Sequence, residues 1–71
     1  PLGRRLACLA WLEMRLGLTP QVQHHAQKAL HLLGSDDIAS CSSCYIALAS
    51  TYEEAGEFEK ARDAFLAELA L

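Results

Sequence analysis

The fold is set by residues 48–61, which read LASTYEEAGEFEKA. An adjacent leucine and alanine begin this stretch, and a glycine separates two segments whose apolar residues have helical spacing. The same leucine, alanine and glycine occur 39 residues earlier, and the matching pairs are Leu9 and Leu48, Ala10 and Ala49, and Gly17 and Gly56. Two copies of one helix–turn–helix unit predict a solenoid fragment, and solenoids bind other proteins far more often than they catalyse reactions.

Glycine residues divide the chain into four predicted helices. Gly17, Gly34 and Gly56 each follow a periodic apolar segment, where a left-handed residue ends a helix at little steric cost. No run alternates strictly between apolar and polar residues, so no strand is predicted. The connections at 17–19 and 56–57 are so short that each helix pair must fold back antiparallel. We therefore predict an all-α protein whose antiparallel helix–turn–helix pairs stack as a right-handed α-solenoid fragment.

The first two helices form one predicted hairpin. The first helix, about Leu2–Leu16, is apolar nearly all round and needs neighbours on more than one side. The second helix begins at Thr19 and Pro20, a hydroxyl N-cap followed by a proline suited to the first helical position. The inward face expected on this helix comprises Val22, Ala26, Ala29, Leu30 and Leu33.

The second hairpin is predicted to begin with an acidic cap. Asp36 or Asp37 can accept bonds from the first backbone N–H groups, and its charge suits the positive end of the helix dipole. The core stripe expected on the third helix comprises Ile38, Cys41, Tyr45, Leu48, Tyr52 and Ala55. The fourth helix is expected to run from Glu57 to the end of the chain, with Phe58, Ala61, Phe65 and Leu69 facing inward. Two ion pairs are predicted on its outer face, Glu57 with Lys60 and Glu59 with Arg62.

The second copy resembles a tetratricopeptide repeat. The matching residues are Leu48, Ala49, Tyr52, Gly56, Phe58, Ala61 and Phe65, with Tyr45 where the family usually has tryptophan. The first copy fits at Leu6, Leu9, Ala10, Gly17, Ala29 and Leu30, and it departs from the family pattern at Glu13, Thr19, Val22 and Ala26. The second copy departs from the pattern at Glu68. The resemblance implies one domain over residues 1–71, with repeat one over about 3–36 and repeat two over about 37–71. The 39-residue period is longer than the family's usual period of about 34 residues.

Composition and charge exclude several classes of function. Residues 1–35 hold four bases and one acid, a charge of +3, whereas residues 36–71 hold two bases and eight acids, a charge of −6. The two halves of the chain therefore carry opposite net charges. The sequence lacks the dense basic face that is typical of a nucleic-acid-binding module. No stretch reaches the roughly 18 apolar residues of a membrane span. Three cysteines are too few for a secreted disulfide scaffold, so we expect a cytoplasmic protein.

The chain begins with Pro1 instead of methionine and stops inside an apolar helical pattern. We expect it to be a piece of a longer protein. The longer repeat resembles the helical arrays of some large regulatory and signalling proteins, so we expect that parent to belong to this class.

Cys41 and Cys44 are the strongest candidates for a chemically reactive site, because a Cys-x-x-Cys pair at a helix N-terminus can be a redox pair. That chemistry belongs to a βαβ setting, and no preceding strand is predicted. A zinc site would join both cysteines to two of His24, His25 and His31, although their order and spacing match no standard zinc pattern. The remaining alternative is that both cysteines are small buried apolar residues. We expect no cofactor and no metal.

We expect no enzymatic activity. The adjacent acids Glu53-Glu54 and Asp36-Asp37 point in different directions on a helix, so the members of a pair cannot flank one bond. The sequence has no glycine-rich phosphate loop, and no serine with a suitable histidine and acid partner.

The resemblance implies a concave groove lined by the first helix of each pair, with a protein or peptide as its ligand. The residues expected to face it are Arg4, Cys8, Trp11 and Arg15 from the first helix and Ser43, Ala47, Ser50 and Glu54 from the third. Ser43, Ala47, Ser50 and Glu54 do not supply the basic and amide groups of the family's clamp for a terminal carboxylate. Trp11 is the expected contact anchor, and the alternative is that it packs beneath a preceding repeat.

A structural role is the rival to partner binding. Two repeats fall short of the roughly three that solenoids usually need. The apolar faces at Leu2–Leu12 and Phe65–Leu71 are expected to be buried by association with another surface. The opposite charges of the two ends favour dimers or end-to-end stacks.

Overall fold

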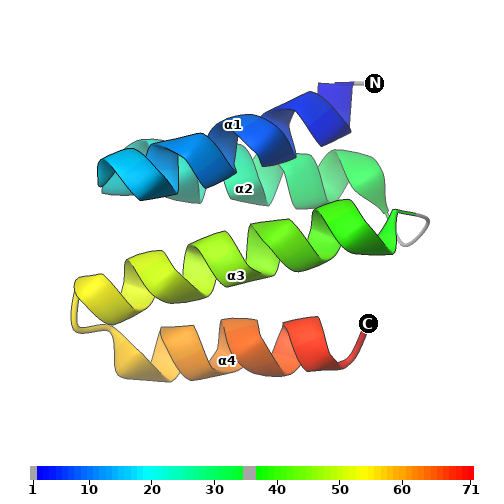
Figure 1. Cartoon of the computed structure of the whole chain (residues 1–71). Helices are drawn as coiled ribbons and strands as arrows, with labels where there is room; N and C mark the ends of the chain where they lie inside the picture. The colour runs from blue at the N-terminus through cyan, green and yellow to red at the C-terminus, as the bar shows by residue number, and fades with distance from the viewer. Residues whose placement is uncertain (1, 35–36) are drawn as a thin grey trace.

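The computed structural model describes residues 2–34 and 37–71, and this part of the chain is all-helical, as predicted (Figure 1). Its helices are α1 (Leu2–Leu16), α2 (Thr19–Leu33), α3 (Ile38–Glu54) and α4 (Phe58–Leu69). The four predicted helices are therefore confirmed, the first with both of its expected bounds. Each of α1 and α3 is followed by a helix that runs back beside it, so the molecule consists of two antiparallel hairpins.

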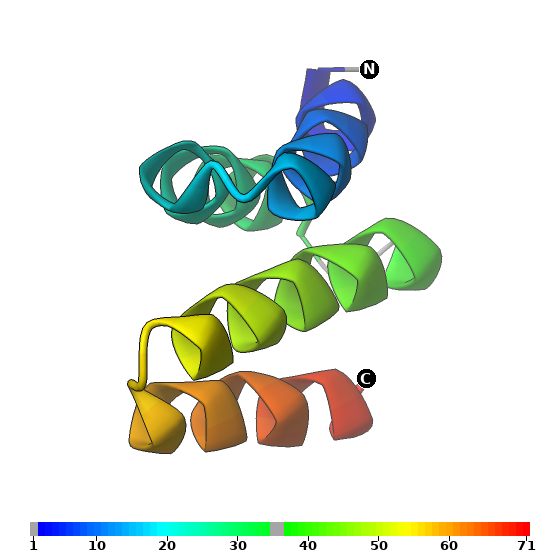
Figure 2. The same ribbon diagram turned by 60° about the vertical axis from the view of Figure 1, so that its left-hand side comes forward.

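The two hairpins are stacked in a row (Figure 2). Helix α3 contacts α1, α2 and α4, whereas α4 contacts no helix but α3 within the described residues. The first hairpin therefore lies on one side of α3 and α4 on the other, an arrangement compatible with a solenoid. None of the helices in the described part of the chain is long and apolar enough to cross a membrane.

The turns inside the two hairpins have the same geometry. Gly17 and Gly56 have φ of 76° and 78°, the left-handed conformation that glycine adopts without steric cost. In the first turn the N–H of Leu18 donates to the carbonyl of Glu13 at 3.0 Å. The matching bond of the second turn joins Glu57 to Tyr52 at 2.8 Å, which is the same pair displaced by 39 residues. The sequence repeat is thus a repeat of backbone structure at this point.

The predicted N-cap residue is found at the start of α3 but not at the start of α2. Asp37 caps α3, since its carboxylate accepts from the Ser40 backbone N–H at 3.0 Å and from the Ser40 hydroxyl at 2.9 Å. The alternative cap, Asp36, lies outside the described residues. The prediction that Thr19 caps α2 is wrong. Leu18 occupies that position and Thr19 is already helical, because the glycine turn brings the chain into the helix one residue earlier.

The core is built mainly from small side chains. Its buried members are Ala7, Ala10, Ala26, Ala29, Cys44, Leu48, Ala49 and Ala64, drawn from all four helices. Small residues let helix backbones approach closely, so the alanines mark the crossings between neighbouring helices. The face predicted for α2 is confirmed, with three of its members buried and Leu30 and Leu33 packed against the cluster.

The stripe predicted for α3 is partly wrong. Cys41 and Leu48 are buried, but Ile38 is 56% exposed and Ala55 is also exposed. The buried residues that the stripe omitted are Cys44, Ala47, Ala49 and Thr51. The physical reason is that α3 has neighbours on both sides, so its buried surface is wider than one stripe.

The inward face predicted for α4 is also wrong except at Ala61. Phe58 is 67% exposed, Phe65 41% and Leu69 76%, while Ala61 and Ala64 are buried. Helix α4 has one helical neighbour, and small residues let it approach α3 closely, so its larger side chains remain on an uncovered flank.

The ion pairs predicted on α4 have different outcomes. The pair between Lys60 Nζ and Glu57 Oε1 is confirmed at 3.2 Å. Arg62 pairs with its neighbour Asp63 at 3.2 Å in place of Glu59.

Candidate functional site

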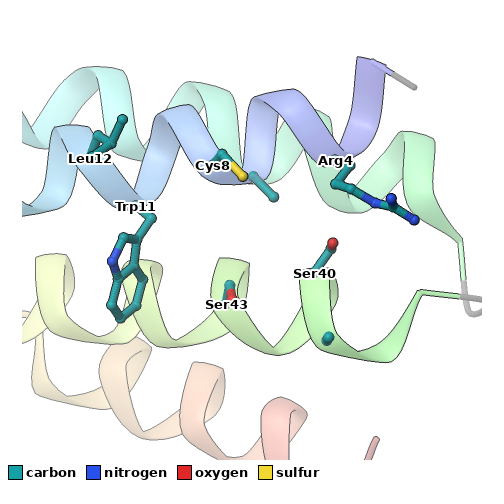
Figure 3. Close-up of a pocket in the computed structure, with 8 residues that line it drawn as sticks. Arg4, Cys8, Trp11, Leu12, Ser40 and Ser43 are labelled. Carbon is teal, nitrogen blue, oxygen red and sulfur yellow. The ribbon is translucent and has the colours of Figure 1, made fainter.

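A hollow of about 490 Å³ lies between α1 and α3 (Figure 3). Its lining is mostly apolar and comprises Arg4, Ala7, Cys8, Trp11, Leu12, Ala39, Ser40 and Ser43. We call this hollow the groove. Concave, largely apolar surfaces with a few polar groups at the edge are typical of ligand sites.

The groove unites half of the residues predicted to face it. Arg4, Cys8, Trp11 and Ser43 are part of the lining, whereas Arg15, Ser50 and Glu54 are not, and Ala47 is completely buried. The lining residues that the sequence missed are Ala7, Leu12, Ala39 and Ser40. The residues predicted on the third helix lie 39 positions after those predicted on the first, so Ser43 corresponds to Arg4. In the structure Ser40 lies opposite Arg4, so the groove is displaced by about one turn toward the start of α3.

One end of the groove is closed by an ion pair between α1 and α3. Arg4 Nε donates to Asp37 Oδ2 at 3.2 Å, while most of the arginine side chain remains exposed. Bonds from the Ser40 backbone and hydroxyl, followed by the nearby Arg4 guanidinium, lower the pKa of Asp37 below its ordinary value. The carboxylate therefore stays charged at neutral pH and ties the first turn of α1 to the N-cap of α3.

The other end of the groove is formed by Trp11. Its indole extends from α1 toward α3 and is partly buried, so one part of the ring contacts protein and another part is open. The thiol of Cys8 points into the space between Trp11 and Arg4 (Figure 3). The groove thus offers an aromatic wall at one end and a cation at the other.

The three cysteines do not form a redox site of the kind considered from the sequence. All three are free thiols, with Cys8 exposed and Cys41 and Cys44 buried. Burial raises the pKa of Cys44 to about 11 and also raises that of Cys41. A catalytic cysteine needs a lowered pKa because the thiolate is the nucleophile. The buried pair therefore has the properties of core residues, as in the plain alternative.

The zinc alternative lacks a suitable geometry. No three side chains of the metal-binding types gather within residues 2–34 and 37–71. His24 and His31 are exposed on α2, whereas Cys41 and Cys44 of α3 are buried. His25 instead places Nδ1 2.7 Å from Glu13 Oε1. Its nearest polar partner is therefore a carboxylate of α1.

A second, shallower hollow of about 400 Å³ lies between α3 and α4. Its lining includes Tyr45, Leu48 and Tyr52 from α3 and Lys60 and Asp63 from α4. The Lys60 ammonium lies 5.7 Å from the centre of the Tyr52 ring, within the range of a cation–π contact. This hollow holds no side chain that the sequence singled out for partner binding.

The chain matches no protein-family model, no curated protein and no solved structure.

Proposed function

We propose that this chain is a protein-interaction module that holds a segment of a partner protein in the groove between α1 and α3. The observation that carries this proposal is the apolar hollow of about 490 Å³ with the partly buried Trp11 at its end. Tryptophan and arginine contribute most to interface energetics when a partner covers them, and the groove presents one of each.

The repeat architecture supports the same proposal. The two hairpin turns have matching backbone bonds at a 39-residue offset, and α3 packs on both helices of the first hairpin. We propose on this basis that the chain is a pair of tetratricopeptide-like repeats, whose first helices line a shared concave face. The three free thiols fit a reducing cytoplasm, where we propose that the chain acts within a larger regulatory or signalling protein.

The chemistry of the lining indicates the kind of segment that the groove accepts. A large apolar side chain can occupy the centre against Trp11, Ala7 and Ala39. A polar or acidic group of the same segment can reach the exposed guanidinium of Arg4. Arg4 and Trp11 are seven residues apart on α1, which is about 10 Å along the helix axis.

The experiment that tests the proposal uses Trp11 as its probe. Peptides are selected against the chain from a random display library, and binding is followed by the fluorescence of Trp11, the single tryptophan. We expect quenching or a blue shift on binding, since a bound segment excludes water from the indole. Selected peptides that bind without any change in this signal would contradict the proposed site.

Matched variants separate the observed groove from the one expected from the sequence. Ser43→Arg fills the groove and should abolish binding, whereas Ser50→Arg and Glu54→Arg lie outside the lining and should preserve it. Trp11→Ala should weaken binding by at least about tenfold, as truncation of an interface anchor does. If Trp11→Ala lowers the melting temperature and leaves affinity unchanged, Trp11 is a packing residue and the proposal fails.

A further inference from the structure

The two walls of the groove leave little for the backbone of a bound segment to pair with. The lining residues lie inside α1 and α3, so their carbonyl groups accept bonds within their own helices. The N–H of Ser40, in the first turn of α3, donates to Asp37 Oδ1 at 3.0 Å. A helix leaves only its first N–H groups unbonded, and these point along its axis. Neither wall therefore offers the free backbone edge that pairs with an extended peptide.

The polar side chains of the lining are also few. They are Arg4 at one end of the groove and Ser40 and Ser43 on α3, beside the weakly polar thiol of Cys8. The Ser40 hydroxyl already donates to Asp37 Oδ2 at 2.9 Å. An extended segment would cross about 10 Å of the groove with about three residues, which bring about six backbone N–H and C=O groups. The groups on its buried side would lose water without gaining partners, and this loss is costly in free energy.

A helical segment avoids this cost, because its backbone groups bond to one another. A helix with its side chains is about 10–12 Å across, so it lies over the hollow and inserts the side chains of one face. The lining residues of α1 match such a face, since Arg4, Cys8 and Trp11 are separated by four and three residues (Figure 3). A helix that crosses α1 at a small angle presents its own side chains at the same steps.

Arg4 gives the groove one positive end. It is the charged member of the lining within the described part of the chain. Of its guanidinium nitrogens, Nε alone is bonded within the described residues, to Asp37, and the arginine side chain is 64% exposed. The terminal Nη groups can therefore donate to a second carboxylate while Asp37 keeps its bond. The net charge of +3 over residues 1–35 also favours an acidic partner.

We propose that the segment held in the groove is an amphipathic helix in which an aspartate or glutamate stands seven residues from a large apolar residue. This inference rests on the proposed function, since it specifies the conformation and chemistry of that partner segment. The large apolar side chain packs against Trp11, and the carboxylate accepts from the Nη groups of Arg4. A smaller apolar side chain between them contacts Cys8 and Ala39. The seven-residue spacing of the partner matches that of Arg4 and Trp11 on α1.

Peptides of about 15 residues from a random display library serve as probes, since this length allows about four helical turns. A peptide is a groove ligand if it changes the fluorescence of Trp11 and if Ser43→Arg abolishes its binding. We expect groove ligands to gain helical circular dichroism on binding and to share an acid seven residues from a large apolar side chain. Groove ligands that bind without gaining helix would overturn this inference and leave the proposed function standing. The absence of any groove ligand would overturn both.

Proline replacement tests the helix within each groove ligand. A proline at a central position that faces away from the groove should weaken binding by about a hundredfold, because it interrupts the backbone bonds of a helix interior. Alanine at the same position is the control and should preserve the affinity. Unchanged affinity of the proline peptide would indicate an extended bound segment and contradict the helix.

A double-mutant cycle between chain and peptide tests the Arg4 contact. Arg4→Ala should weaken binding by about tenfold, and it should have no further effect once the acid of the peptide is alanine. Arg5→Ala is the control, since Arg5 is exposed and lies outside the lining. Replacing the acid of the peptide by its amide gives the same test without altering the chain, and it should also weaken binding. Independent effects in the cycle, or an amide peptide of full affinity, would rule out this pairing.

Discussion

Glu13 and His25 form the most buried ionisable contact between the helices of the first hairpin. Glu13 Oε1 lies 2.7 Å from His25 Nδ1, and the glutamate side chain is 10% exposed. The corresponding positions of the second hairpin hold Tyr52 and Ala64, so one hairpin uses a polar pair where the other uses an aromatic ring beside a methyl group. The two solutions fill equivalent space between antiparallel helices.

We expect Glu13→Ala to lower the free energy of unfolding by about 1–3 kcal/mol, because His25 then loses its partner in a partly buried site. Urea unfolding measures the change. His25→Ala completes a double-mutant cycle, and a coupling energy of zero would contradict the contact. The double variant Glu13→Tyr, His25→Ala copies the second hairpin and should recover stability that Glu13→Ala loses.

The cap of α3 predicts a pH dependence of stability. The pKa of Asp37 is lowered by bonds from Ser40, so the folded state favours the charged carboxylate. This contribution is present in full above the ordinary value of 3.8 and is lost as the pH falls through the lowered value of the folded state. Asp37→Ala should reduce the melting temperature at neutral pH and remove this part of the acid dependence. An unchanged acid limb in thermal denaturation would show that Asp37 does not contribute to it.

The thiols are expected to react in two classes. Cys8 is exposed, whereas burial holds the pKa of Cys44 near 11. A thiol reagent at mildly alkaline pH should therefore modify Cys8 rapidly, and Cys41 and Cys44 only after unfolding. Because the folded state retains the Cys44 proton above the ordinary value of 9.0, stability should also fall as the pH rises from about 9 toward 11. Cys8→Ser should abolish the fast phase, and a remaining fast phase would place a second thiol at the surface.

Close helix packing predicts the effect of adding volume at an alanine. Ala49 has no exposed surface and lies in the core cluster with residues of all four helices. Ala49→Leu should cost about 1–3 kcal/mol by overpacking. The matched control is Ala55→Leu, at an exposed position just after α3. Equal melting temperatures for the two variants would contradict close packing at Ala49.

The sequence was sufficient for the local structure of this protein except at the start of α2, where Leu18 and not Thr19 occupies the N-cap position. The left-handed glycines, the acid at the start of α3 and the helical spacing of apolar residues act over a few neighbouring positions, so they are readable without knowledge of the fold. The repeat offset correctly paired the two hairpin turns for the same reason. Four helices in two hairpins followed from these local signals.

The tertiary structure decided which apolar side chains of α3 and α4 are buried and where the groove lies. Phe58 and Leu69 have the spacing of core residues, but α4 has a helix on one side only, so these side chains remain uncovered. Ser40 joins the groove and Ala47 does not, because the offset between α1 and α3 depends on how their surfaces interlock. Periodicity specifies the faces of a single helix, whereas burial is a property of the neighbours that each face meets.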